Sequence, residues 1–229
     1  SLVGGRYGCN FGNSAPTSYF GRFVPDRLDA EIPALACGTF TYSGQPFPAR
    51  ITARNVAGAT TRNYSGTFAK NVTFSDVNGT PGGSLPLPRP PGVFTGGVPP
   101  LPATPSVRFP FPSALTAPAT IRLRATDAEG VSSATGSEGT TPIRSGRLNI
   151  QNAHGSELRA LPVSVTAQYF TGTGFATNTE DNCTTVAPGN IMMGNWQRNL
   201  AACETGLSGG GTLSGGTTQL RLGQPGAGN

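Results

Sequence analysis

The sequence predicts an all-β fold made of two immunoglobulin-like β-sandwich modules, with a Pro-rich insert and Gly-rich ends. Gly and Pro, the two poorest helix formers, account for 33 and 21 of the 229 residues. Short stretches of alternating apolar and polar residues recur between turn-forming residues, a pattern typical of many short strands. The 12 Phe and 5 Tyr can build a core, which disfavours a wholly disordered chain.

The first sandwich is expected over residues 20–131, after an irregular arm at residues 1–19. Its clearest strand is residues 120–126, where Ile121, Leu123 and Ala125 alternate with polar residues. Turn residues separate the other expected strands, which are 20–24, 38–42, 47–55, 64–68 and 72–74.

Residues 81–118 differ in composition from the rest of the first module. They contain twelve prolines, which remove backbone donors and exclude a central strand. We expect an exposed, polyproline-like loop here. Val107, Phe109 and Phe111 alternate, so part of the insert is expected to lie along a sheet edge.

The second sandwich is expected over residues 140–229, after a Ser/Gly/Thr-rich linker at 132–140 that sets the domain boundary. Its cleanest alternation is residues 163–170. Further strands are expected at 148–150, 175–177 and 217–222, with Met192, Met193 and Trp196 as core or cap residues.

Three turns share one pattern: Asn55-x-x-Gly58, Asp127-x-x-Gly130 and Asn152-x-x-Gly155. Asn and Asp side chains bond back to the turn backbone, and Gly accepts positive φ. The repetition suggests two related sandwich modules.

The net charge of +5 comes almost wholly from scattered arginines, because Lys70 is the single lysine. A nucleic-acid interface needs a concentrated basic face, so no nucleic-acid partner is expected. No apolar run approaches the roughly 18 residues of a membrane span. The chain begins at Ser1 without a signal peptide, so we interpret it as a mature or excised piece of a longer protein.

The four cysteines, Cys9, Cys37, Cys183 and Cys203, are expected to form disulfides. None has CxxC spacing and the one histidine is distant in sequence, which gives a zinc site weak support. Disulfides imply an oxidising compartment. Of the three possible connectivities, we favour the sequence-local pairs Cys9–Cys37 and Cys183–Cys203; free buried thiols are the alternative.

No catalytic residue, cofactor or metal is expected. His154 lies in a predicted turn, and no GxSxG or phosphate-loop motif accompanies it. Calcium would have only two acidic groups, Asp127 with Glu129 and Glu180-Asp181-Asn182, and neither has a known calcium-loop spacing.

Two further hypotheses concern Lys70 and the aromatic residues. Lys70 shares parity with Phe68 and Phe74, so it could point inward and form a Lys–Asn cross-link, but we favour a solvated Lys70 at a hairpin tip. Sugar binding would use exposed aromatic side chains, for which the candidates are Trp196, Tyr169, Tyr64 and Tyr42.

Several ordered segments resemble MshQ-like proteins, which are associated with the mannose-sensitive haemagglutinin (MSHA) type IV pilus of Gram-negative bacteria. The resemblance covers about residues 20–205. The segments that carry it are 21–26, 42–47, 63–66, 147–158, 161–163, 168–170 and 178–184. It implies an exported surface protein in which this chain is one β-rich portion, and it transfers no catalytic residue. The chain departs from the family in its longer Pro-rich insert and in stopping at Asn229.

We therefore expect a non-enzymatic structural or adhesive module of an exported bacterial cell-surface or pilus-associated protein. Its expected partners are other copies, other surface or pilus proteins, or glycans. One alternative is a self-assembling extracellular filament subunit, in which residues 1–19 and 206–229 donate strands to neighbouring copies. A second is a carbohydrate-binding module. A glycan hydrolase ranks last, because no pair of carboxylates lies in a recognisable motif.

Overall fold

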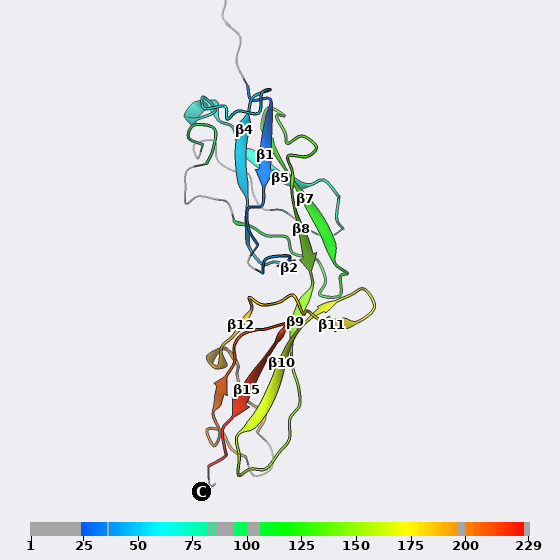
Figure 1. The fold of residues 1–229 in the computed structure, drawn as a ribbon, viewed down its shortest axis with the longest axis vertical. Coiled ribbons are helices and arrows are strands. Elements are labelled where there is room, and N and C mark those ends of the chain that lie inside the picture. The colour runs from blue at the N-terminus through cyan, green and yellow to red at the C-terminus, as the bar shows by residue number, and fades with distance from the viewer. Residues whose placement is uncertain are drawn as a thin grey trace, which may run out of the picture.

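The fold is nearly all-β, as predicted, in a computed structural model that describes residues 24–35, 37–81, 83, 85, 94–99, 106–196 and 200–226 (Figure 1). Its helical turns in that part of the chain are two short 3-10 turns, η1 (Gly66–Phe68) and η3 (Pro188–Asn190). The strands form two units, which we call the N-terminal domain (24–144) and the C-terminal domain (145–226).

The N-terminal domain is built around a four-stranded sheet in the order β2-β8-β7-β5. Strand β7 pairs antiparallel with both of its neighbours, whereas β2 runs parallel to β8. A β1-β4 pair packs over this sheet, and a β3-β6 pair completes the domain. The strands are β1 (Arg27–Glu31), β2 (Thr41–Tyr42), β3 (Phe47–Pro48), β4 (Arg50–Arg54), β5 (Val72–Asp76), β6 (Ser106–Val107), β7 (Ala119–Asp127) and β8 (Gly139–Arg144).

The Pro-rich segment contributes to this core, which corrects the expectation of an exposed loop. Phe94, Val107, Phe109 and Phe111 are all buried against Ile51, Leu123 and the other core residues. Strand β6 pairs with β3, so Val107 lies on a strand as expected, whereas Phe109 and Phe111 follow it outside any strand. Their apolar side chains dock although the flanking prolines prevent a central strand. Residues 86–93 and 100–105 lie outside the described residues.

The C-terminal domain has a five-stranded sheet in which β10 is central and longest. Strand β9 pairs with one edge of β10, and β15 and β11 pair with the other. The facing layer is a small β12-β14 pair. The strands are β9 (Gly146–Ile150), β10 (Leu161–Phe170), β11 (Phe175–Thr177), β12 (Thr185–Val186), β13 (Leu207–Gly209), β14 (Gly211–Thr212) and β15 (Thr217–Leu222).

The alternating residues Val163, Val165 and Ala167 of β10 are buried as predicted. They form the core of this domain with side chains of the other strands, Val186, Leu213 and Leu220. Met192, in contrast, is 98% exposed, so it is not the core or cap residue that the sequence suggested.

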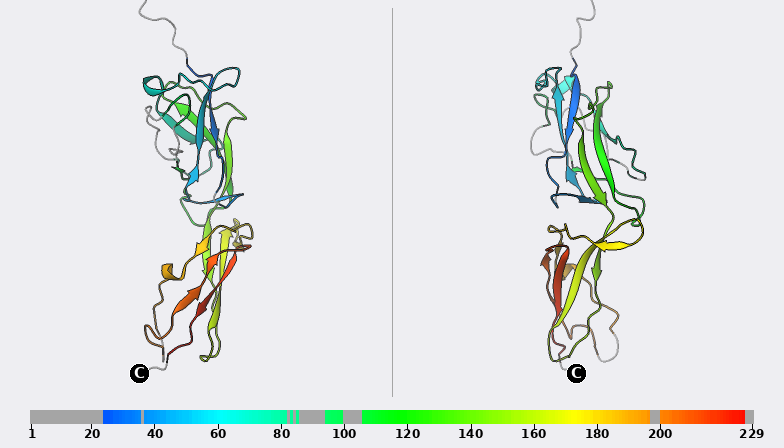
Figure 2. Two further views of the ribbon diagram at one scale, coloured as in Figure 1. Left: turned by 60° about the vertical axis from the view of Figure 1, so that its left-hand side comes forward. Right: turned by 45° about the vertical axis from the view of Figure 1, so that its right-hand side comes forward.

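The boundary between the domains lies later than the sequence suggested. The linker expected at residues 132–140 belongs to the N-terminal domain, where the Ala30 amide donates to the Ser137 carbonyl and β8 pairs with β7. Strand β8 then runs through Ser145 directly into β9. The two domains therefore lie end to end along one elongated molecule (Figures 1 and 2).

The filament hypothesis names the C-terminal segment as a strand donor, but its strands already have partners in this chain. Residues 207–222 form β13, β14 and β15, all paired within their own domain. The other proposed donor, residues 1–19, and the strand expected at 20–24 lie outside the described residues apart from Val24.

Candidate functional site: the junction between the domains

The junction is formed where β2 of the N-terminal domain lies beside the end of β8. The parallel register sets Tyr42 opposite Arg144, and the Ser43 amide donates to the Arg144 carbonyl. On the other side, the loop between β11 and β12 supplies residues 178–184. Segments that are far apart in sequence therefore meet around the single connecting residue, Ser145.

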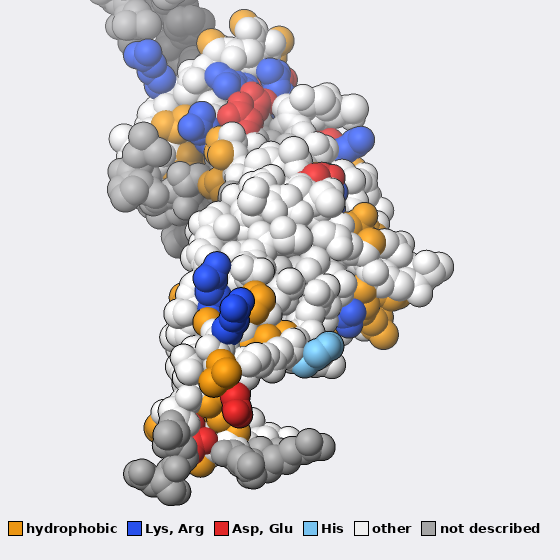
Figure 3. Space-filling model, turned by 60° about the horizontal axis from the view of Figure 1, so that its bottom comes forward, with side chains coloured by type: hydrophobic (Ala, Val, Ile, Leu, Met, Phe, Trp, Pro, Cys, Tyr) orange, Lys and Arg blue, Asp and Glu red, His pale blue; other side chains and the backbone are white. Residues whose placement is uncertain are grey.

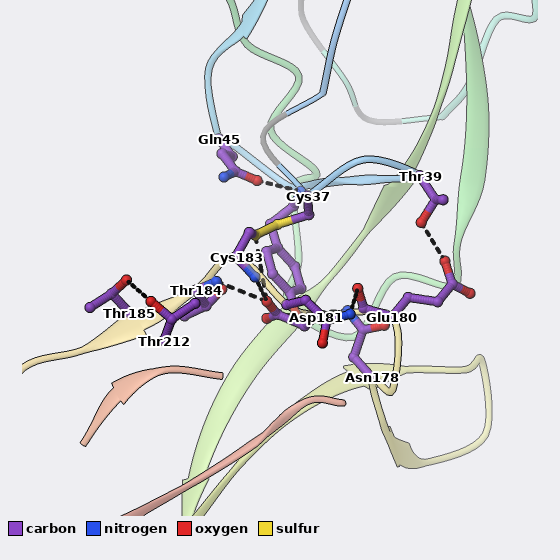
Figure 4. The surroundings of a disulfide bond; sticks show 12 residues. Cys37, Thr39, Gln45, Asn178, Glu180, Asp181, Cys183, Thr184, Thr185 and Thr212 are labelled. Atoms are coloured by element: carbon purple, nitrogen blue, oxygen red, sulfur yellow. Dashed lines mark hydrogen bonds between the residues drawn. A yellow bond between two sulfur atoms is a disulfide. The ribbon is translucent and has the colours of Figure 1, made fainter. Parts of the chain in front are cut away.

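A disulfide joins the two domains across this junction. Cys37, which precedes β2, bonds to Cys183, which precedes β12, with Cα atoms 5.1 Å apart and 146 residues between them in sequence number (Figure 4). The sequence-local pairing is therefore wrong for both of these cysteines. Cys203 is exposed and has no disulfide partner among the described residues, and Cys9 lies outside them.

Tyr42 connects to the C-terminal domain through its hydroxyl group. This hydroxyl donates to Asp181 Oδ2 at 2.8 Å and accepts from Asn178 Nδ2 at 2.7 Å. Asp181 is fully buried, and its other oxygen accepts the amides of Cys183 and Thr184 at 3.1 and 2.9 Å. One carboxylate thus orders the loop that carries the disulfide and also binds the opposite domain.

Arg144 makes a second polar connection at the end of β8. Its Nη1 donates to Asn178 Oδ1 at 2.5 Å, and its Nη2 donates to Glu180 Oε1 at 2.9 Å. The guanidinium also lies between the rings of Phe40 and Tyr169, with its carbon 4.6 and 4.9 Å from their centroids. Arg144 therefore contacts both domains with its charge and with its flat faces.

These contacts shift the ionisation of three groups. Burial raises the pKa of the Tyr42 hydroxyl well above its ordinary value, and the neighbouring Asp181 adds to the rise. Burial acts to raise the pKa of Asp181, but hydrogen bonds from Thr184, Tyr42 and Cys183 outweigh it and leave that pKa lowered. Hydrogen bonds from Arg144 and Thr39 lower the pKa of Glu180. Around neutral pH the two carboxylates are ionised and Tyr42 keeps its proton.

The Tyr42 ring approaches the backbone so closely that residue 146, which follows Ser145, is a glycine. A Cβ atom on Gly146 would lie 2.4 Å from Cδ1 of the Tyr42 ring, far inside van der Waals contact. The ring therefore packs directly on the backbone where the chain passes from one domain to the other.

A cavity of about 470 Å³ opens beside the polar network. Each domain contributes apolar and small polar side chains to its walls. They include Tyr42, Phe111 and Ser113 from the N-terminal domain and Leu148, Ala167 and Thr184 from the C-terminal domain.

The other residues considered from sequence do not form a shared site. His154 is exposed in the segment between β9 and β10. Lys70 precedes β5, is partly exposed, and has its Nζ 3.4 Å from Glu129 Oε1. Asp127 accepts the amides of Glu129 and Val131 and the hydroxyl of the buried Tyr64.

Glu180 and Asp181, which were considered as calcium ligands, instead accept hydrogen bonds from Arg144 and Tyr42 at the junction. Within the described residues, one group of three metal-ligating side chains lies close together, Cys37, Asp181 and Cys183, and its two cysteines are bonded to each other. Of the aromatic candidates, Tyr169 stacks on Arg144 and Tyr42 is the register partner of Arg144 between β2 and β8, whereas Trp196 is half-buried elsewhere in the C-terminal domain.

Sequence reasoning missed the roles of Asn178, Arg144 and Gly146. Each of them acts through a partner on the other domain, so local alternation gives no signal for it. The resemblance to a known family did include residues 178–184, without assigning them a role.

Comparisons with known proteins give a family without a described activity. No curated protein and no solved structure matches this chain significantly. The family model for the third domain of DUF6701 matches residues 10–142, and the model for its fourth domain matches residues 144–229. The two matches meet at the junction described above. The chain belongs to the DUF6701 family and comprises its third and fourth domains.

Proposed function

We propose that this chain is a non-enzymatic structural module that holds two β-sandwich domains in a fixed relative orientation within an exported bacterial surface protein. The observation that carries the proposal is the Cys37–Cys183 disulfide between the domains. Two polar connections, through Tyr42 and through Arg144, reinforce it. A covalent bond and ordered hydrogen bonds at one junction restrict the bending that separate domains otherwise undergo.

The disulfide also supports an extracellular location, because such bonds persist in oxidising compartments and are rare in the cytosol. Within the described residues, no helix has the length and hydropathy needed to cross a bilayer. The face seen in Figure 3 is largely uncharged, with acidic and basic side chains scattered over it, which fits a displayed surface better than a nucleic-acid interface.

The finer assignment rests on the resemblance to MshQ-like proteins. On that basis the module belongs to a Gram-negative cell-surface or pilus-associated protein, and its partners are other surface or pilus proteins. Its role is to space and orient whatever the neighbouring parts of that protein present.

Small-angle X-ray scattering of the oxidised chain tests this role. The Cys37→Ser/Cys183→Ser double variant removes the covalent connection, and Cys203→Ser is the matched control because it leaves that connection in place. We expect the oxidised chain and the control to scatter as one elongated particle, and the double variant to show a broader distribution of interdomain angles. A broad distribution already present in the oxidised chain would refute the proposal.

A further inference from the structure

The C-terminal domain leaves part of its apolar sheet face uncovered. On the ladder between β9 and β10, Leu148 lies opposite Ala167 and Ile150 lies opposite Val165. Cross-strand partners point to the same face of a sheet, so all four side chains face the core side. Val165 and Ala167 are buried there, but Leu148 and Ile150 remain 48% and 47% exposed.

The backbone of β9 is also open on the side away from β10. The Ser145 carbonyl accepts the Phe170 amide, and the Gln151 amide donates to the Ser164 carbonyl, so the odd-numbered residues face β10. In an antiparallel ladder the alternate residues direct their N–H and C=O groups outward. Gly146, Leu148 and Ile150 therefore present free backbone groups at this edge, and no strand of the described chain pairs with them.

This open edge borders the interdomain cavity. Leu148 and Ala167 form one wall of the 470 Å³ space, and Phe111 and Ala114 of the N-terminal domain form another. The uncovered face is thus continuous with the interface between the domains, which would cover the end of an inserted segment.

Arg147 places a positive charge at this edge of the sheet. Arg147 points to the opposite face of β9, where its Nε donates to Gln168 Oε1 at 2.9 Å and its guanidinium carbon lies 3.5 Å from the Phe175 ring centroid. Its Nη groups have no hydrogen-bond partner within the described part of the chain. A strand that pairs with β9 would bring an outward-facing side chain beside this guanidinium.

We propose that β9 accepts an extended strand from another polypeptide. The strand pairs with the outward backbone groups of Leu148 and Ile150, places apolar side chains at alternate positions over the open face and into the cavity, and carries an acidic residue beside Arg147. Addition of a strand to an exposed edge supplies affinity through the main chain and specificity through alternate side chains. This binding role goes beyond the spacer function, which does not require it.

A flexible segment fits the edge better than a second folded copy does. Two β9 edges pairing with each other would bury mainly two Leu and two Ile side chains that are already half covered. Stable interfaces bury roughly 1,200–2,000 Å². An extended strand can also place alternate side chains inside the cavity.

A designed peptide tests the proposal on the whole oxidised chain. The probe is a fluorescein-labelled octapeptide in which valine alternates with threonine and one threonine is replaced by aspartate. The control peptide carries proline at its central valine, which blocks strand pairing. Fluorescence anisotropy measures binding to the unmodified chain, to Leu148→Lys, and to Leu158→Lys, a matched control at a side chain that is 72% exposed and lies outside β9.

We expect saturable binding that weakens by about tenfold or more in Leu148→Lys and is kept in Leu158→Lys, since loss of a buried apolar contact has effects of this size. Hydrogen exchange reports the backbone contacts directly: the Leu148 and Ile150 amides should become protected when the peptide binds.

Absence of saturable binding, equal binding by both variants, or protection confined to other strands would overturn the proposal. So would concentration-dependent dimerisation abolished by Leu148→Lys without peptide binding, because it would identify a second copy as the occupant. None of these binding outcomes affects the X-ray scattering experiment that tests the fixed orientation of the domains. Either proposal can therefore be refuted without refuting the other.

Discussion

At the scale of single residues, Tyr42 shows how one hydroxyl couples the two domains. Replacing Tyr42 with Phe keeps the ring on Gly146 but removes the hydroxyl that bonds to Asp181 Oδ2 and Asn178 Nδ2, while the other hydrogen bonds of these two residues remain. Removing one partner of buried polar groups costs about 1–3 kcal/mol. We expect Tyr42→Phe to lower the free energy of unfolding by this amount, measured by urea denaturation at neutral pH, with Tyr169→Phe as a control that leaves the Asp181 contact intact.

The same residue predicts an alkaline limit to stability. Because the folded-state pKa of Tyr42 is raised, the unfolded chain loses this proton first, near the ordinary value of 10.0. The stability linked to the proton is therefore complete below about pH 10 and declines as the pH rises further. The loss between neutral pH and pH 11 should be smaller in Tyr42→Phe than in the unmodified chain. Equal losses in both proteins would show that Tyr42 is not the group responsible.

Gly146 gives a steric prediction at the same point. Gly146→Ala places a Cβ against the Tyr42 ring, and such overpacking typically costs about 1–3 kcal/mol. Gly194→Ala is the matched control, because a Cβ there would meet nothing within 4 Å. Thermal unfolding followed by circular dichroism should show a lowered midpoint for Gly146→Ala alone. An unchanged midpoint would mean that the ring moves away without cost.

Two turns could be predicted from the sequence, whereas the pairing of the cysteines could not. The Asn55 and Asp127 turns form as expected, with side-chain oxygens accepting later amides and with Gly58 and Gly130 at positive φ. Disulfide bonding of Cys37 and Cys183 was predicted, but their pairing with each other was not, because pairing depends on how the domains meet, and sequence separation gives no information on that.

At the scale of elements, the Pro-rich segment shows that a proline-rich composition does not exclude a core role. Phe109 is buried among N-terminal core residues, so Phe109→Ala should lower the free energy of unfolding by about 3–5 kcal/mol. Leu115→Ala, at a side chain that is 62% exposed in the same segment, should change it little. Urea denaturation of both variants checks this, and a small effect of Phe109→Ala would mean that the segment merely lies on the surface.

The strands with sustained alternation were predictable, and so were the shorter β5, β9 and β11, which lie at or around the expected residues 72–74, 148–150 and 175–177. Strands β7, β10 and β15 lie close to their expected positions, because alternate apolar residues face one core, three of them buried in β7 and in β10, and Leu220 with the partly buried Leu222 in β15. Strand β1 was missed, since Leu28 and Ala30 alternate with charged residues over only five positions. Residues 64–68 were expected as a strand, but Gly66 has φ 52° and begins the turn η1.

At the scale of the whole molecule, the domains differ in the size of their cores. The N-terminal core cluster contains eighteen buried residues in the described chain, whereas the C-terminal cluster contains six. We expect the C-terminal domain to unfold at the lower temperature in differential scanning calorimetry. Loss of a native disulfide typically costs about 2–5 kcal/mol, so reduction should lower this transition further. A lower transition that belongs to the N-terminal domain would contradict the prediction.

The continuous path from β8 through Ser145 into β9, closed by the Cys37–Cys183 bond, has a mechanical consequence. Tension applied to the two ends of the molecule passes through the sulfur–sulfur bond and bypasses the intervening chain. The bond spans 146 positions, which corresponds to about 500 Å of extended polypeptide that cannot be drawn out while it is intact. The four-stranded N-terminal sheet and the β9–β10 ladder are therefore protected from the applied tension, and only the segments before Cys37 and after Cys183 can lengthen.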